Sequence, residues 1–243
     1  MQMMNRYILP TLLLVVTVAF AAAPALTPPF VGYAPDQFPV LIPRPSIQPG
    51  GYAFAIWGPI YLGLILQAGF GLWKRAGDAA WTPSRLPLIG AVALGSVWLA
   101  IALAAPITAT LVILLMAALA LTAFLSAETT RDRWILSAPM AMFAGWLTAA
   151  ASVSTGVVLA GYGWLSDTLS ALVMLVAVLA VAITVQSRRP AMPLFAATVI
   201  WAIIGVVVVN WTGNPLVSYA GIMGIAVLAA AATTFFRRDP VRP

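Results

Sequence analysis

Residues 49–64 read PGGYAFAIWGPIYLGL and do not form the plain apolar segment that a lipid bilayer alone requires. The stretch opens on Pro-Gly-Gly. It places Phe54, Trp57 and Tyr61 at i, i+3 and i+7, so the three rings share one face of a helix. Pro59 lies between the two larger rings, removes one backbone hydrogen bond and crowds the carbonyl of Ala55. We therefore expect a helix that is kinked or loosened at Pro59 and carries an aromatic face.

A carbonyl group freed inside a membrane must find another partner, a water molecule or a cavity. Together with the aromatic face, this predicts an aromatic-lined mouth at the outer third of the membrane. A kinked packing helix with interfacial aromatic residues is the alternative.

The composition is that of an integral membrane protein. Of the 243 residues, 63% are hydrophobic and only 7% are charged, whereas a soluble domain carries roughly 25% charged residues. The apolar segments are long enough to cross a bilayer as helices. The predicted fold is an all-α, polytopic transmembrane helix bundle of about eight spans, forming a single membrane domain over residues 1–243. The predicted spans are approximately 7–26, 52–73, 86–104, 106–126, 134–160, 166–186, 192–212 and 215–236.

The basic residues indicate the topology. Eleven of the twelve fall on one side if the N-terminus is cytoplasmic, and only Arg44 falls outside. Because cytoplasmic loops are enriched in Lys and Arg, we expect both termini in the cytoplasm, in a bacterial inner membrane. The basic residues form pairs in short loops rather than one patch, so no nucleic-acid partner is expected. A cleaved signal peptide ending near residues 19–25 (AFAAAPA) is the alternative for the first segment.

The residue types argue against catalysis and against a metal site. The chain has no Cys and no His, which removes thiol chemistry, the usual general base and the usual axial ligands of haem iron. No Asp, Glu, Lys or Arg is expected in the membrane interior, which argues against ion-coupled transport. We therefore predict a protein that is not an enzyme and requires no cofactor. Gln67 is the uncharged polar residue whose amide most needs a partner in the membrane.

The nine tryptophans fall into two groups. One group lies at span ends or in loops, where aromatic belts at the membrane surface account for most of its members: Trp73, Trp81, Trp134, Trp164 and Trp211. The other group lies deep within spans: Trp57, Trp98, Trp146 and Trp201. Each deep indole N–H needs an acceptor, so we expect this group to face protein or a cavity, with core filling as the alternative for each.

Small residues mark one face of the segment 134–160. They recur at spacings of four, four, three and four: Ala141, Gly145, Ala149, Ser152 and Gly156. Such a face lets helix backbones approach closely. Trp146 flanks this expected seam, a position that suits a pocket wall.

Residues 49–61, PGGYAFAIWGPIY, resemble the second-helix motif of the TspO/MBR family, the tryptophan-rich sensory protein and translocator protein relatives. The similarity is to the longer, multi-span branch of that family. Pro49, Gly50, Trp57 and Tyr61 fall on the family pattern.

A second stretch, residues 138–154 (APMAMFAGWLTAAASVS), resembles a later helix of the same family, with Pro139, Trp146 and Ala150 on the pattern. The Asn of the family pattern is Ser154 here, and its Asn-x-x-Trp motif is reduced to residues 95–98, GSVW. The resemblance covers residues 45–160. Residues 161–236 are additional transmembrane helices without a transferable motif.

The resemblance implies a helical bundle with a pocket for flat hydrophobic ligands, such as porphyrins and other tetrapyrroles, sterols and synthetic aromatic drugs. It also implies a sensory or regulatory role. The candidate ligand-binding residues are Phe54, Trp57, Pro59, Tyr61, Trp98, Trp146 and Ser154.

Residues 27–51 form a proline-rich outer segment, which is expected to be stiff and extended. It could lie across the mouth as a lid, and Arg44 could meet an acidic group such as a propionate; a solvated loop charge is the alternative.

Three functions remain open: a membrane sensor or binding protein, a facilitator that moves its ligand across the bilayer, and a non-catalytic accessory subunit of a larger membrane complex. The expected partners are a hydrophobic small molecule such as a tetrapyrrole, membrane lipid, and a second copy or a larger complex.

Overall fold

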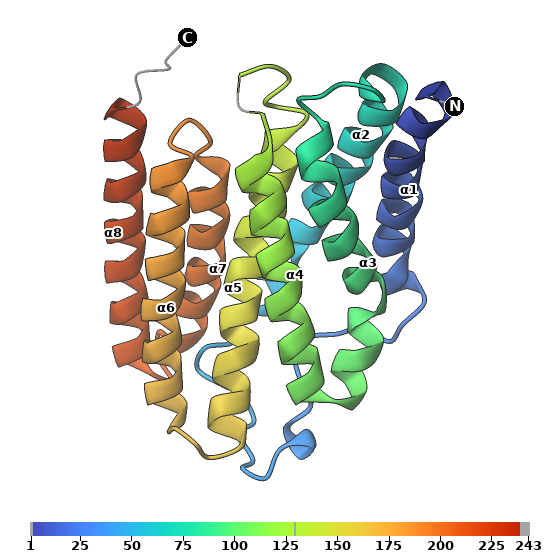
Figure 1. Cartoon of the computed structure of the whole chain (residues 1–243). Coiled ribbons are helices and arrows are strands. Elements are labelled where there is room, and N and C mark those ends of the chain that lie inside the picture. Colours follow the sequence, from blue (N-terminus) through green and yellow to red (C-terminus); the bar gives the residue numbers. More distant parts are fainter. Residues whose placement is uncertain (1, 129, 239–243) are drawn as a thin grey trace.

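The structure, a computed structural model, describes residues 2–128 and 130–238. Within these ranges the chain forms eight α-helices that run alternately up and down in one bundle (Figure 1). The all-α, polytopic fold expected from the sequence is therefore confirmed. The helices are α1 (Gln2–Ala22), α2 (Trp57–Arg75), α3 (Thr82–Ala104), α4 (Pro106–Ser126), α5 (Ser137–Gly161), α6 (Asp167–Arg188), α7 (Leu194–Asn210) and α8 (Pro215–Arg238).

Seven of these helices are long and apolar enough to cross a membrane, whereas α7 has only 17 residues. At 1.5 Å per residue, α7 is roughly 25 Å long, somewhat less than the hydrocarbon thickness of a bilayer. It packs against α5 and α8. The segment predicted at 192–212 is therefore shorter than expected, and α7 is the one predicted span that falls below full length.

Helix α5 is the centre of the bundle and packs against α2, α4, α6 and α7. As predicted, its face of small residues lets neighbouring backbone approach α5 closely. A Cβ atom on Gly145 would lie only 2.8 Å from the carbonyl oxygen of Phe195 in α7, and one on Gly156 would lie 3.0 Å from Ile47. The glycines therefore bring α7 and the loop before α2 directly against α5.

The start of α2 differs from the prediction. Residues 51–56 form a 3-10 helix, η3 (Gly51–Ile56), and the α-helix begins only at Trp57. Pro59 is therefore the third residue of α2, where a backbone N–H has no partner within the helix in any case. The looser geometry expected near Pro59 is found in the 3-10 turn before Trp57, which includes Ala55, the residue whose carbonyl Pro59 was expected to crowd.

The two ends of the bundle differ in charge. The start of α1, the end of α8 and the connections 76–81, 130–136 and 189–193 lie at one end, called here the basic end (Figure 1). The long loop, residues 26–50, lies at the opposite end and contains Arg44; Arg242 lies outside the described residues. All other basic residues lie at the basic end: Arg6, Lys74, Arg75, Arg85, Arg131, Arg133, Arg188, Arg189, Arg237 and Arg238.

One arginine at the basic end is buried within a helix. Arg85 lies in the first part of α3, before the predicted start at 86, and is only 3% exposed. Its guanidinium donates hydrogen bonds to the carbonyls of Arg75 and Ala76 at the end of α2. Terminal helix carbonyls lack intrahelical partners and attract cations. Arg85 therefore stabilises the turn between α2 and α3 without entering the middle of the membrane.

Asp132 joins two connections at the basic end. Its carboxylate accepts hydrogen bonds from Arg75 Nε at 2.7 Å and from Trp81 Nε1 at 3.2 Å. The hydrogen bond from Arg75 holds the pKa of Asp132 below its ordinary value. Trp81 is 1% exposed, so its expected place in the membrane-surface belt is wrong. The other four tryptophans assigned to that belt are exposed: Trp73, Trp134, Trp164 and Trp211.

Candidate functional site

A cavity of about 200 Å³ lies among α1 to α5, with Ala202 of α7 at its edge, and is covered by the long loop. Its walls are mostly apolar, and the described residues that line it include no Asp, Glu, Lys or Arg. The helices contribute Phe20, Phe54, Trp57, Tyr61, Gly95, Trp98, Leu99, Ile113, Met116, Trp146, Leu147, Ala149, Ala150, Val153, Ser154, Val157 and Ala202 (Phe54 from η3). The loop and its approach contribute Ala23, Pro24, Thr27, Pro28, Pro29, Phe30, Gly32, Tyr33, Gln48 and Pro49.

The structure brings six of the seven residues singled out from the sequence to this cavity: Phe54, Trp57, Tyr61, Trp98, Trp146 and Ser154. Pro59 is the exception. It is exposed on the outside of α2 and does not line the cavity. Because Pro59 lies two residues after Trp57, the helical turn points it away from the face that carries Trp57 and Tyr61.

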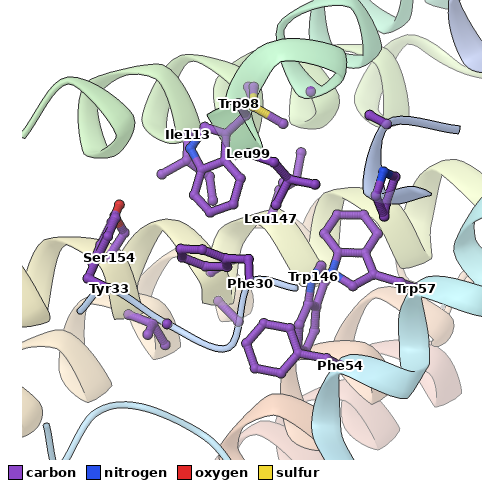
Figure 2. Close-up of a pocket in the computed structure, with 18 of the residues that line it drawn as sticks. Phe30, Tyr33, Phe54, Trp57, Trp98, Leu99, Ile113, Trp146, Leu147 and Ser154 are labelled. Carbon is purple, nitrogen blue, oxygen red and sulfur yellow. The ribbon is translucent and has the colours of Figure 1, made fainter. Parts of the chain in front are cut away.

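One wall of the cavity is built from aromatic rings of η3, α2 and α5. Trp57 stacks on Tyr61 with ring centroids 5.2 Å apart and planes 15° apart. Trp146 meets Trp57 edge-on at 6.1 Å and Phe54 edge-on at 5.8 Å. Phe20 of α1, which also lines the cavity, meets Tyr61 edge-on at 5.1 Å. Trp98 of α3 faces this wall across the cavity (Figure 2).

The indole N–H groups of the deep tryptophans differ in their partners. Trp98 donates to the carbonyl of Ala109, and Trp201 donates to the carbonyl of Ala53, both at 2.9 Å. Trp201 packs η3 against α7 and does not line the cavity. In contrast, no described residue accepts a hydrogen bond from Trp57 Nε1 or Trp146 Nε1, or pairs with the Tyr61 hydroxyl. The aromatic wall therefore carries three donors without protein partners.

A cluster of hydroxyl groups lies at another edge of the cavity. The Ser154 hydroxyl lies 2.6 Å from the Tyr33 hydroxyl and 2.7 Å from that of Thr110. Thr110 also bonds to the carbonyl of Pro106 in its own helix. Burial raises the pKa of Tyr33 more than these two hydroxyl groups lower it, so the phenol stays neutral at physiological pH. The cluster ties the long loop to α4 and α5.

Some residues of the site were missed from the sequence. Phe30 and Tyr33 lie in the proline-rich loop, where no periodic pattern indicates which side chains point inward, and Phe20 lies in a span without any distinguishing motif. Arg44 is exposed and is not part of the cavity wall, so the expected meeting with a propionate gains no support. Gln67 lies outside the cavity, and its buried amide has no hydrogen-bond partner among the described residues.

The comparisons with known proteins agree with this architecture. A family model described as TSPO-like protein matches residues 6–234. The match extends from α1 into α8, well beyond the two motifs at the aromatic wall. No curated protein and no solved structure matches the chain.

Proposed function

The chain belongs to the TSPO-like protein family, and from that premise we propose that it is a membrane sensor or binding protein for a flat hydrophobic ligand. The ligand class is tetrapyrrole-like or sterol-like, and the site is the cavity between the aromatic wall and Trp98. The observation that carries the proposal is the convergence of Trp57, Tyr61 and Trp146, with their unpaired donors, on one largely apolar cavity.

The unpaired donors indicate what the ligand must offer. The N–H groups of Trp57 and Trp146 are not among the fully buried unpaired polar atoms of the described residues, so a ligand can reach them, and an indole N–H can only donate. Trp57 and Trp146 would therefore both be satisfied by an acceptor atom on the ligand, such as a carbonyl oxygen or a ring nitrogen. A ligand without any acceptor would leave these donors unpaired and lose affinity.

The uncharged lining limits where an acidic ligand could place its charge. Burying an ionised carboxylate without a partner is very costly, and the cavity wall offers no cation. A tetrapyrrole would therefore place its macrocycle against the aromatic wall and keep its propionates in water at the loop end. Its methyl ester should bind at least as well as the free acid.

The position of the cavity favours binding over passage. Its lining on α2 ends at Tyr61, and no residue of the basic end contributes to it. A facilitator needs a path that opens to both sides of the membrane, so we expect vesicles containing only this protein to show no ligand movement beyond passive leak.

Equilibrium binding to the purified full chain tests the proposal. The probes are metal-free protoporphyrin, its dimethyl ester and a sterol, followed by quenching of Trp fluorescence. Trp57→Phe and Trp146→Phe keep an aromatic ring but remove the N–H, and each should weaken binding by about tenfold at most, the upper range for one hydrogen bond. Trp164→Phe is the matched control, because Trp164 is exposed far from the cavity wall. Failure of all three probes to bind would contradict the proposal.

A further inference from the structure

Phe30 is a loop residue whose ring lines the cavity. It meets Trp98 edge-on, with ring centroids 5.2 Å apart and planes at 79°. Figure 2 shows Phe30 reaching in from the loop, with Trp98 on one side and Phe54 and Trp146 on the other. The Phe30 ring therefore lies between Trp98 and the aromatic wall.

The free space beside Phe30 is small. The cavity measures about 200 Å³, whereas pockets that hold drug-sized ligands measure roughly 300–1,000 Å³. A large flat ligand therefore does not fit while Phe30 stays in place. Removing the Phe30 ring would join the free space to the region between Trp98 and Trp146.

We propose that residues 27–34 are an internal occupant of the site: Phe30 fills the place of the ligand, and a ligand binds by exchanging with it. The exchange rests on the function proposed above. The occupancy itself is a property of the unliganded chain and can be measured without any ligand.

The hydroxyl cluster is the latch that keeps this segment in place. Tyr33 lies three residues after Phe30 in the same irregular segment. Its hydroxyl bonds to Ser154 at 2.6 Å. The ring of Tyr33 also meets Phe30 at 5.7 Å. Because Gly32 adopts a φ of 126°, which L side chains rarely adopt, the backbone can bring both rings inward. The Tyr33 hydroxyl also lies 3.5 Å from that of Thr110, and Gln48 Nε2 donates to the carbonyl of Val31 at 2.8 Å.

The end of the long loop, residues 46–50, is anchored to α6, α7 and the connection between α7 and α8. The backbone N–H of Ser46 donates to Asp167 in α6 at 2.9 Å, and its carbonyl accepts from Asn210 Nδ2 in α7 at 2.7 Å. Asn214, just before α8, donates to the Ser46 hydroxyl at 3.0 Å. The Gly50 N–H bonds to the carbonyl of Gly205 at 3.1 Å. Helices α6 and α7 and the connection before α8 therefore fix residues 46–50, so release of Phe30 involves the first half of the loop.

Such an occupant would tune the apparent affinity. A ligand that can bind only when the site is vacated binds more weakly, in proportion to the fraction of molecules in the open state. Changes that release Phe30 without touching the aromatic wall should therefore strengthen ligand binding, which is the opposite of what loss of a wall residue does.

The occupancy is tested by thiol labelling. The chain has no cysteine, so Ala150→Cys places a single thiol in the cavity wall, where Phe30 should protect it from a small water-soluble maleimide. Tyr33→Phe keeps the ring but removes the latch hydroxyl, and should raise the labelling rate by about tenfold, equivalent to roughly 1.4 kcal/mol in the opening equilibrium. Phe30→Ala should raise it at least as much. Leu41→Cys, at an exposed site on the same loop, should label equally in all backgrounds.

Two results would overturn the proposal: rapid labelling of Ala150→Cys with Phe30 and Tyr33 intact, or no acceleration in either variant. The second part of the test measures binding of metal-free protoporphyrin. Phe30→Ala should bind it more tightly and Phe54→Ala less tightly. Weaker binding by Phe30→Ala would make Phe30 a wall residue and overturn the inference. Accelerated labelling without protoporphyrin binding to any variant would leave the occupant supported and count against the proposed function alone.

Discussion

The indole rings of Trp57 and Trp146 meet edge to face, with centroids 6.1 Å apart and planes at 80°. The two residues belong to the two sequence motifs, one at the start of α2 and one in the middle of α5. Tyr61 covers one face of Trp57 by stacking at 5.2 Å. This geometry creates a corner in the aromatic wall rather than a flat stack, and both residues line the cavity.

Truncating either tryptophan should therefore weaken ligand binding. We expect Trp57→Ala and Trp146→Ala each to lose more than about 2 kcal/mol of binding free energy, as for buried aromatic anchors. Titration of metal-free protoporphyrin measures this, with Trp164→Ala as a control expected to bind like the unmodified chain. Equal, small effects in all three variants would mean that Trp57 and Trp146 only fill the core.

Tetrapyrrole binding should be nearly indifferent to the metal. The chain has no His and no Cys, which leaves Met and Tyr as the possible axial ligands of haem iron; Met116 and Tyr61 line the cavity but are not arranged around a marked site. Burial of the flat macrocycle, at about 25 cal/mol per Å² of apolar surface, does not depend on the metal. Metal-free protoporphyrin and its iron form should bind within about tenfold of each other. A strong preference for the iron form, with the spectrum of a six-coordinate low-spin centre, would show that a protein atom coordinates the metal.

The fold could be predicted because hydropathy and charge act locally. Each span had to be long and apolar, and at the basic end Lys or Arg lies in each short connection or in the helix ends that adjoin it. The aromatic wall could also be predicted, because Trp57 and Tyr61 lie four residues apart on one helix face. The predicted start of α2 was too early. The spacing of Phe54, Trp57 and Tyr61 is the same whether residues 51–56 belong to an α-helix or form a 3-10 helix, as they do here.

The inner face of the long loop could not be predicted. The Tyr33 hydroxyl bonds to Ser154 on α5, and Ser46 fixes the end of the loop through Asp167 and Asn210; each partner lies more than a hundred positions away. A proline-rich segment has no periodic pattern that would predict such contacts. The same limit explains Trp81, which is buried because Asp132 accepts its N–H from another connection.

The membrane orientation can be tested by thiol accessibility. If the basic end is cytoplasmic, as the Lys and Arg distribution predicts, a cysteine at Gly213 should react with an impermeant maleimide in intact cells. One at Ser187, at the basic end, should react only after permeabilisation. Gly213 is a suitable site because an added Cβ would have no neighbour within 4 Å. The reverse labelling pattern would require the opposite orientation.

Acid should weaken the basic end through Asp132. The hydrogen bond from Arg75 lowers the pKa of Asp132 in the folded chain, so the unfolded chain binds the proton more readily. The resulting stabilisation is present above the ordinary value of 3.8, and it is lost as the pH falls through the lowered folded pKa. Asp132→Asn lacks this contribution at every pH.

Thermal unfolding in detergent, followed over roughly pH 3 to 7, measures this linkage. The Tm of Asp132→Asn should lie below that of the unmodified chain at neutral pH, and the difference should shrink in acid. Asp36, which is exposed in the long loop, provides a matched control. The Tm of Asp36→Asn should follow that of the unmodified chain across the pH range. A constant difference between Asp132→Asn and the unmodified chain across the pH range would contradict the assignment.

The close approach of α5 and α7 should be sensitive to a single methyl group. A Cβ on Gly145 would lie 2.8 Å from the Phe195 carbonyl oxygen and 3.1 Å from Thr198 Cβ. Because the first contact is with backbone, rotation of a side chain cannot relieve it, and the helices must separate. Overpacking of this kind costs about 1–3 kcal/mol, so Gly145→Ala should lower the Tm. Gly69→Ala is the control, because Gly69 lies within α2 with no atom within 4 Å of an added Cβ, and replacing a mid-helix glycine by alanine gains roughly 0.5–1 kcal/mol. If Gly145→Ala unfolds at the same temperature as Gly69→Ala or higher, then α5 and α7 do not meet through a glycine seam.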